Sequence, residues 1–170
     1  MIVVITDTSP IRYLVRIGEV DLLKKLYGQV IVPGVVLAEL QAEDGLPIVR
    51  AGAGNLPTWV RVQSPAKQLA VTLSNLHRGE SQAIALAEEL QAALLLIDDR
   101  AGMQVALERG LTITGTLGVL VEAAQAGLTQ IEEVLQKLQA TNFRATPGLY
   151  ERALEMARLQ PPALPRRKKE

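Results

Sequence analysis

The stretch LLLIDD at 94–99 places the strongest limit on what this chain can fold into. A short, continuous apolar run is typical of a strand buried on both faces, as in a parallel sheet that helices cover on both sides. Two aspartates follow this run directly, although adjacent carboxylates repel each other. The sequence therefore predicts a buried strand whose end carries charge for a structural or a chemical reason.

Short apolar runs recur along the chain with helical patterns between them. The other strand-like runs are at 2–6, 29–33, 59–63 and 111–114. Helical patterns lie at 8–27, interrupted at Gly18, and at 33–43, 65–76, 78–93, 101–110, 117–127, 130–139 and 147–159, while 44–58 reads as a loop or a weak helix. Thr8 or Ser9 can cap the first helix, and Thr116 can cap the helix at 117–127. Strands joined by helices pair in parallel through right-handed crossovers, so we expect an α/β protein, a three-layer α/β/α sandwich with a mainly parallel central sheet.

The length of the chain bounds the number of domains. A chain of 170 residues is long enough for one domain with a sizeable core. We expect a single domain over residues 1–160 that includes the C-terminal helices. The segment 161–170 contains the basic run RRKK and is expected to be a disordered tail.

The composition excludes several classes of protein. The chain has 18 basic and 18 acidic residues, so it is not a highly charged nucleic-acid coat. It contains no cysteine, which excludes disulfides, thiolate zinc sites and cysteine nucleophiles and favours a reducing compartment. The sequence shows no basic leader before the first apolar run and no uncharged stretch long enough to span a bilayer. We therefore expect a cytoplasmic protein without a membrane contact.

Five acidic residues stand out by their positions. Ligands of open α/β sheets bind beyond the carboxyl ends of the strands, and Asp7, Asp98 and Asp99 each come directly after a predicted strand. Glu39 stands in the otherwise apolar stretch VVLAEL, and Glu80 stands at the start of its helix. We expect the three aspartates to share one edge of the sheet.

Each of these acids also has an ordinary structural interpretation. Asp7 can cap the first helix, and one of Asp98 and Asp99 can cap the next helix. Glu39 can reach solvent at the edge of its helix, and Glu80 can complement the helix dipole as a first-turn acid. The functional hypothesis depends on their combination and not on any one of them.

Converging carboxylates need a counter-charge. Without one they repel each other, and at least one of them takes up a proton. Oxygen ligands with no cysteine and a single histidine favour Mg²⁺ or Mn²⁺ over zinc. One or two such ions in an acidic cluster are the usual apparatus for phosphodiester hydrolysis. The histidine, His77, is interpreted as a helix-boundary residue, because a general base is redundant beside a metal that generates the nucleophile.

Several motifs match a known family in order and spacing. The stretches DTSP, VPGVVLAEL, RGESQAIALA, LLIDDRAG and ITGTLGVLVEAAQAGL resemble those of the PIN-domain nucleases. The resemblance is greatest to the prokaryotic branch that includes the VapC-type toxins of toxin–antitoxin pairs. It runs from the first residues to about 128, and FRATPGLYERALEMA is similar to the helical ending of that branch.

The resemblance implies a Mg²⁺- or Mn²⁺-dependent ribonuclease with a compact α/β/α fold. The four acids of the family fall on Asp7, Glu39 and Glu80 and within the pair Asp98 and Asp99. We expect the first acid, the third and one aspartate of the pair to bind the metal directly, with the second completing the site directly or through water. Toxins of this branch usually pair with an antitoxin protein and often form homodimers, so RNA, an antitoxin and a second copy of the chain are the expected partners.

Two positions near the acids have less definite roles. The hydroxyl residue that follows the first acid of the family corresponds to Thr8 or Ser9. After the last acid the chain reads RAGMQ, where the commoner toxin form continues with another acid and an aromatic residue. The resemblance therefore leaves open whether Asp98 or Asp99 binds the metal.

The sequence also contains candidates for substrate contacts and leaves two other functions to consider. Arg12, Arg78 and Arg100 are candidates for RNA phosphate contacts, and each is equally well interpreted as a solvated residue or an ion-pair partner of the acids. A phospho-receiver domain has paired acids after its first strand and a lysine further along the chain. This interpretation is disfavoured, because the paired acids of the present chain come late and ITGT supplies no lysine. The other alternative is a non-catalytic PIN-like module that binds RNA or a protein.

Overall fold

The central layer of the protein is a parallel sheet. The computed structural model describes residues 2–43, 56–67 and 76–159. Its five strands are β1 (Val4–Thr6), β2 (Val30–Val32), β3 (Val60–Val62), β4 (Leu94–Leu96) and β5 (Ile113–Thr114). All neighbouring pairs run parallel, in the order β3-β2-β1-β4-β5. Each of the apolar runs therefore forms the strand that the sequence predicts.

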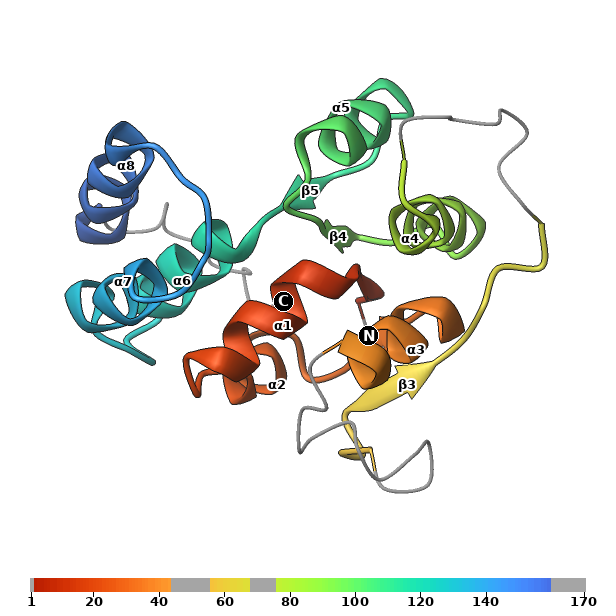
Figure 1. Ribbon diagram of the computed structural model, residues 1–170, viewed down its shortest axis with the longest axis horizontal. Helices are drawn as coiled ribbons and strands as arrows, with labels where there is room; N and C mark the ends of the chain where they lie inside the picture. Colours follow the sequence, from red (N-terminus) through yellow and green to blue (C-terminus); the bar gives the residue numbers. More distant parts are fainter. Residues whose placement is uncertain (1, 44–55, 68–75, 160–170) are drawn as a thin grey trace, which may run out of the picture.

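Helices connect the strands and complete the chain (Figure 1). They are α1 (Thr8–Arg16), α2 (Asp21–Tyr27), α3 (Gly34–Glu43), α4 (Arg78–Glu89), α5 (Arg100–Glu108), α6 (Thr116–Gln125), α7 (Ile131–Gln139) and α8 (Pro147–Arg158). Most of the helix predicted at 65–76, most of the segment 44–58 and the basic tail 161–170 lie outside the described residues, and the described residues 65–67 and 76 are not helical. Within the described ranges, no helix combines the length and the apolarity needed to cross a membrane.

Alternating strand residues pack on opposite faces of the sheet. Val4, Val32 and Leu96 belong to one buried cluster, which includes the apolar faces of α1, α2, α6, α7 and α8. Ile5 and Leu95 belong to a second cluster, which includes apolar residues of α4 and α5. The sheet is thus covered on both faces, and the predicted three-layer α/β/α arrangement is confirmed. The helices α6, α7 and α8 gather at one end of the molecule, on the left in Figure 1.

The strand order creates a switch point beside β1. The chain leaves β1 toward β2 and β3 on one side, and then returns to form β4 on the other side of β1. Thr6 and Leu96 are aligned across β1 and β4, and the backbone N–H of Asp7 donates to the carbonyl oxygen of Leu96 at 2.9 Å. Ligands of open α/β sheets bind at such a switch point, beyond the carboxyl ends of the strands. The residues that follow β1 and β4 are therefore the first place to look for a site.

Two predicted helix caps are wrong. Thr8 and Thr116 are the first helical residues of α1 and α6, and the N-cap positions belong to Asp7 and Gly115. Both threonine side chains make other contacts, described below, because carboxylates lie within reach of their hydroxyls. The predicted interruption at Gly18 is confirmed: its φ of 73° is in the left-handed region, which ends α1 and favours glycine.

Candidate active site

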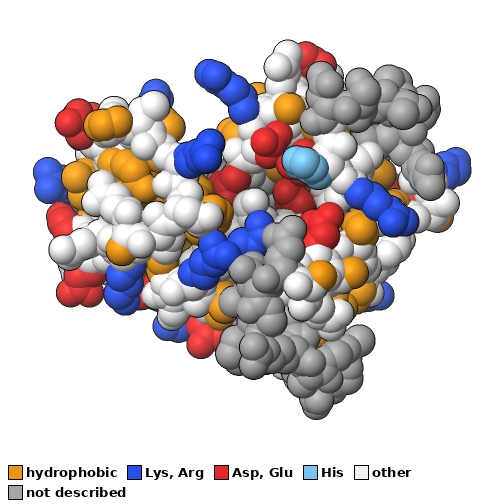
Figure 2. All heavy atoms as spheres, in the orientation of Figure 1, with side chains coloured by type: hydrophobic (Ala, Val, Ile, Leu, Met, Phe, Trp, Pro, Cys, Tyr) orange, Lys and Arg blue, Asp and Glu red, His pale blue; other side chains and the backbone are white. Residues whose placement is uncertain are grey.

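A pocket of about 480 Å³ opens at the carboxyl edge of the sheet. The five acids singled out in the sequence all line it: Asp7, Glu39, Glu80, Asp98 and Asp99. In the space-filling view, carboxylates gather around one hollow on this face, next to the only histidine side chain (Figure 2). The prediction that the three aspartates share one edge of the sheet is confirmed, and the two glutamates join them there.

Asp7 is the most deeply buried of these acids among the residues that the structure describes. Its side chain follows β1 directly and is only 4% exposed. Burial raises the pKa of the Asp7 carboxyl to about 7, an effect that the backbone N–H of Thr8 partly offsets and that the charges of Glu80, Glu39 and Asp98 increase. The side chain makes no capping hydrogen bond to α1. The structural interpretation as a helix cap therefore does not account for this carboxylate.

Glu39 reaches the pocket from the middle of α3. Its Oε2 accepts a hydrogen bond of 2.5 Å from the hydroxyl of Thr8. A methyl group at Gly79 would lie 2.7 Å from Oε2 of Glu39 and 3.2 Å from Oδ1 of Asp7. Oxygens of two carboxylates from different elements thus lie beside the backbone of Gly79, in the space that a side chain at this position would occupy.

Glu80 enters the pocket from the first turn of α4. It is 5% exposed, and its Oε2 accepts a hydrogen bond of 3.2 Å from the backbone N–H of His77. Burial raises the pKa of the Glu80 carboxyl, and the charges of Asp99 and Glu39 raise it further, against the opposing effect of His77. A first-turn acid that only complemented the helix dipole would lie in solvent, whereas this side chain faces other carboxylates.

Asp98 is held by the start of α6. Its Oδ1 accepts a hydrogen bond of 2.7 Å from the backbone N–H of Thr116, and its Oδ2 accepts one of 2.6 Å from the hydroxyl of the same residue. Burial raises the pKa of the Asp98 carboxyl, and these two hydrogen bonds oppose that effect. Because β5 pairs with β4 and Thr114 is aligned with Leu96, Thr116 and Asp98 lie side by side, each two residues after its strand.

Asp99 is exposed and caps α5. Its Oδ2 accepts a hydrogen bond of 3.1 Å from the backbone N–H of Gly102. The expectation that one aspartate of the pair caps the next helix is thus met by Asp99, while Asp98 anchors a different helix. Asp98 acts electrostatically on Asp7, and Asp99 acts on Glu80. The two aspartates therefore extend toward different members of the acidic group.

The chemistry of the pocket suits a hard divalent cation. Within the part of the chain that the structure describes, no three carboxylate or imidazole side chains are already arranged as ligands of one ion. The donors are nevertheless all carboxylate oxygens, and two of them lie beside Gly79. Burial and the charges of neighbouring carboxylates raise the pKa values of Asp7 and Glu80. A bound Mg²⁺ or Mn²⁺ ion would offset this repulsion by charge neutralisation, and both ions take oxygen ligands. The residues present therefore fit such an ion.

The polar environment of the acids extends beyond the carboxylates. The helices α1, α4, α5 and α6 all begin at this edge of the sheet, directly after or beside the acids. The first turn of a helix carries a partial positive charge, which stabilises nearby anions. Thr8 and Ser9 line the pocket as expected, and His77 lines it from the N-cap position of α4.

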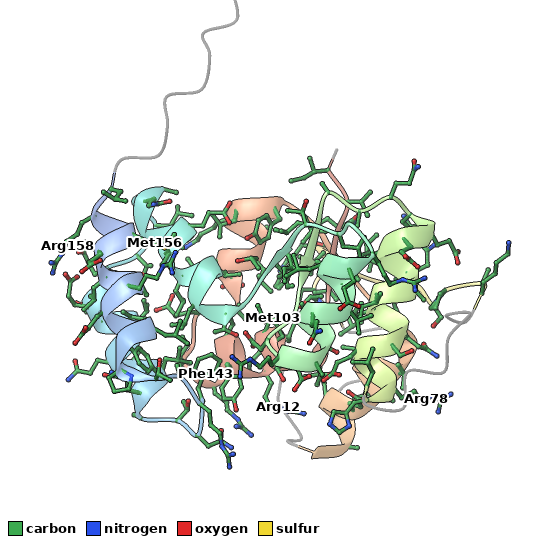
Figure 3. All side chains as sticks on the ribbon, turned by 90° about the horizontal axis from the view of Figure 1, so that it is seen from above. Arg12, Arg78, Met103, Phe143, Met156 and Arg158 are labelled. Carbon is green, nitrogen blue, oxygen red and sulfur yellow. The ribbon has the colours of Figure 1, made fainter. Side chains whose placement is uncertain are left out.

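The basic residues near the acids divide into two groups. Arg12 lines the pocket, whereas Arg78 and Arg100 are exposed and are not among its lining residues. Figure 3 shows Arg12 on the same edge of the molecule as Phe143 and Arg78, with Arg12 between the two. Sequence reasoning missed four lining residues: Tyr13, Asn142, Phe143 and Arg144. The last three lie between α7 and α8, and no local motif indicates that this loop reaches the acids.

The sequence is similar to proteins of one known family. A family model described as a PIN domain matches residues 3–158. Among solved structures, a PilT N-terminus domain protein from the hyperthermophilic archaeon Sulfolobus solfataricus P2 is 21% identical, with a TM-score of 0.44, over 86% of this chain and 100% of that chain. No curated protein matches the sequence. The residues matched by the family model include all five acids of the pocket.

Proposed function

Because this chain belongs to the PIN-domain family, whose members are commonly nucleases, we propose that it is a Mg²⁺- or Mn²⁺-dependent endoribonuclease. The observation that carries the proposal is the gathering of five carboxylates around one pocket at the switch point of the sheet. Buried carboxylates that repel one another destabilise a protein, and groups with such shifted pKa values cluster at functional sites. Bound cations would relieve this repulsion and could hold an RNA phosphate at the same place.

The acids have different roles in holding the cations. In this proposal Asp7, Glu80 and one aspartate of the pair Asp98 and Asp99 hold the cation directly, and Glu39 completes the site directly or through water. The charges of Glu80, Glu39 and Asp98 all act on the carboxyl group of Asp7, which supports a shared site. A bound divalent cation supplies Lewis-acid chemistry, which activates water and stabilises negative charge on phosphate oxygens.

The remaining residues of the pocket orient the acids and the substrate. The hydroxyl of Thr8 donates to Glu39 and keeps that carboxylate directed toward Asp7. Thr116 holds both oxygens of Asp98. Arg12 lines the same pocket from α1 and is the proposed contact for an RNA phosphate, which fixes the position of the backbone without reading the base.

A cleavage assay with a matched control tests the proposal. Wild type is expected to cut labelled RNA in Mg²⁺ or Mn²⁺ and to lose this activity in EDTA. Asp7→Asn is expected to lower cleavage by at least about 100-fold, because it removes a charged ligand. Asp21→Asn, which changes an exposed first-turn aspartate of α2, is expected to retain full activity. Cleavage that persists in EDTA or in Asp7→Asn contradicts the metal-dependent mechanism. RNA binding without cleavage and without metal binding in calorimetry favours the non-catalytic module.

We further propose that the protein is the toxin of a toxin–antitoxin pair, with RNA as its substrate, an antitoxin as its inhibitor and a homodimer as its assembly. The support is the resemblance of the motifs to the VapC-type branch. Expression in a bacterial host is then expected to arrest growth, and Glu80→Gln is expected to relieve the arrest. Glu155→Gln, which changes an exposed glutamate of α8, is the control that keeps the arrest. Normal growth with the wild type removes the toxin proposal and leaves the nuclease proposal in place.

A further inference from the structure

The loop between α7 and α8 forms part of the pocket that contains the acids. Asn142, Phe143 and Arg144 line it together with Asp7 and the other carboxylates, although they follow the acids late in the sequence. In Figure 3 the labelled Phe143 lies along the same edge of the molecule as Arg12 of α1. The pocket thus has an acidic part at the strand ends and a second part contributed by this loop and α1.

Several contacts hold this loop in a defined conformation. The ring of Phe143 packs edge-to-face on Tyr13 of α1, with the ring centroids 4.9 Å apart and the planes at 85°. Nη1 of Arg16 donates to Oδ1 of Asn142 at 2.9 Å. The hydroxyl of Thr141 donates to the carbonyl oxygen of Leu138 at 2.6 Å and accepts from the N–H of Phe143 at 3.1 Å. The loop is therefore preorganised against α1 rather than only covering the surface.

The alternation of side chains along the loop places Arg144 on its exposed side. Phe143 and Ala145 are partly buried and pack on the apolar core, whereas Asn142 and Arg144 are exposed. Within residues 2–43, 56–67 and 76–159, Arg144 has neither a hydrogen bond nor an ion pair from its side chain. Arg144 thus lines a pocket of carboxylates. Among the described residues, the contacts of its neighbours fix the loop, and the side chain of Arg144 makes none of them.

We propose that Arg144 binds a backbone phosphate of single-stranded RNA next to the phosphate that is cut; this inference rests on the proposed nuclease function. An RNA strand that approaches five carboxylates needs positive charge beside them, and guanidinium is the side-chain group that best fits a phosphate in a two-pronged contact. Arg144 supplies this charge from the loop, where Arg78 and Arg100 do not line the pocket.

The size of the pocket favours a single strand over a duplex. A volume of about 480 Å³ is that of a small-molecule site, which admits one nucleotide and its flanking phosphates. Double-stranded RNA is instead recognised by contacts that span successive grooves. The α7–α8 loop then acts as a positioning element: Phe143 and Asn142 fix the loop on α1, and Arg144 contacts the substrate.

A binding experiment isolates this contact from catalysis. The probe is a fluorescein-labelled, single-stranded RNA of mixed sequence, and the protein carries Asp7→Asn to suppress cleavage. Adding Arg144→Gln is expected to weaken binding about tenfold. It should also make the dependence of log affinity on log salt shallower by about 0.7, the value for one lost phosphate contact on a single strand. Arg144→Lys is expected to keep the salt dependence, since it keeps the charge. Arg152→Gln, which changes an exposed arginine of α8 outside the pocket, is the matched control.

The outcomes separate this inference from the proposed function. Equal affinity and equal salt dependence of the Arg144→Gln and Arg152→Gln proteins overturn the role of Arg144, even where the wild type cleaves RNA. Binding of a duplex probe as tightly as the single strand overturns the choice of substrate. RNA binding without cleavage by the wild type contradicts the nuclease function, while the same comparison still decides the role of Arg144. In cleavage assays on proteins that keep Asp7, the Arg144→Gln substitution is expected to raise KM about tenfold with little change in kcat.

Discussion

Thr116 and Asp98 are joined by two hydrogen bonds that occupy both oxygens of the carboxylate. The backbone N–H of Thr116 donates at 2.7 Å and its hydroxyl donates at 2.6 Å. One residue thus fixes the rotation of the acid about its side-chain bonds and, in the same contact, ties the start of α6 to the end of β4. A carboxylate held in this way keeps its orientation before any cation or substrate arrives.

Removing the hydroxyl of Thr116 is expected to weaken both stability and activity. Thr116→Val keeps the shape of the side chain but leaves one buried oxygen of Asp98 without its donor. The free energy of unfolding should fall by about 1.5–3 kcal/mol, and cleavage should fall about 10- to 100-fold, as for other partners that orient metal ligands. Thr112→Val, at an exposed position just before β5, is the control. Thermal denaturation and RNA cleavage measure the two effects; equal behaviour of the two variants would falsify the role of the hydroxyl.

Gly79→Ala is expected to separate activity from stability. The new methyl group would lie 2.7 Å from Oε2 of Glu39, a flexible side chain that can move away, so folding should be preserved. Alanine also favours a helix over glycine by about 1 kcal/mol. The displaced carboxylate can no longer meet Asp7, and we expect cleavage to fall at least about tenfold with no loss in Tm.

Gly148→Ala provides a matched control for this substitution. Gly148 occupies the second position of α8, as Gly79 does in α4, but a methyl group there would meet its nearest neighbour, Oγ1 of Thr146, only at 4.0 Å. Both variants should be at least as stable as the wild type, and only Gly79→Ala should lose activity. Full cleavage by Gly79→Ala would show that the meeting of Glu39 with Asp7 has no part in the reaction.

The raised pKa of Asp7 predicts an unusual dependence of stability on pH. In the folded protein the pKa is about 7, against an ordinary value of 3.8. Between about pH 4 and pH 7 the folded state keeps a proton that the unfolded state has released, so the free energy of unfolding decreases as pH rises through this window. The loss is complete above the folded pKa, and at about 1.4 kcal/mol per pKa unit it amounts to at most about 4 kcal/mol.

Asp7→Asn is expected to make this decrease smaller in the metal-free protein, because the contribution of Asp7 is lost while those of Glu80 and Asp98 stay. The variant should be more stable than the wild type at pH 8, while the difference should shrink at pH 4.5. Excess Mn²⁺ should stabilise the wild type at pH 8 and stabilise the variant far less, because the cation replaces the proton. Urea denaturation at both pH values measures these differences. Parallel pH profiles for the two proteins would show that the carboxyl group of Asp7 is not responsible.

Asp98→Asn and Asp99→Asn are expected to differ in their effects on folding. Asparagine caps helices about as well as aspartate, so Asp99→Asn should keep α5 and the Tm. Asp98→Asn loses one of its two acceptors for Thr116 and should lower the Tm as well. Calorimetric titration with Mn²⁺ should detect weaker binding in the variant whose aspartate is a metal ligand. Unchanged Mn²⁺ binding in either variant would remove that aspartate from the ligands.

The layers and the acids could be predicted because both depend on local patterns. The buried run at 94–97 indicates a parallel strand by its apolarity alone, and the strand ends locate Asp7 and Asp98 at one edge. The position of the strand ends also predicts that Thr116 lies near Asp98, since Thr116 comes shortly after β5, the strand that pairs with β4. Its interpretation as a helix cap was wrong because the hydroxyl meets a carboxylate that lies 18 positions earlier in the chain.

The α7–α8 loop could not be predicted from any local pattern. Its place in the pocket depends on the packing of Phe143 on Tyr13 and on the bond between Asn142 and Arg16, which joins positions 126 apart in the chain. The same limit applies to the arginines. Arg78 and Arg144 are both exposed and both lie near the start of a helix. Only the folded structure shows that Arg144 lines the pocket and that Arg78 is not among its lining residues.

The distance in sequence between the two parts of the pocket has a consequence for the order of synthesis. Every acid of the pocket precedes residue 100, whereas the loop that completes the pocket follows residue 140. Chains begin to fold from the N-terminal side while they are still being translated. A nascent chain therefore carries all its carboxylates for some time without Phe143 and Arg144 beside them. Under the proposed nuclease function, this order delays the finished site until the α7–α8 loop has been synthesised.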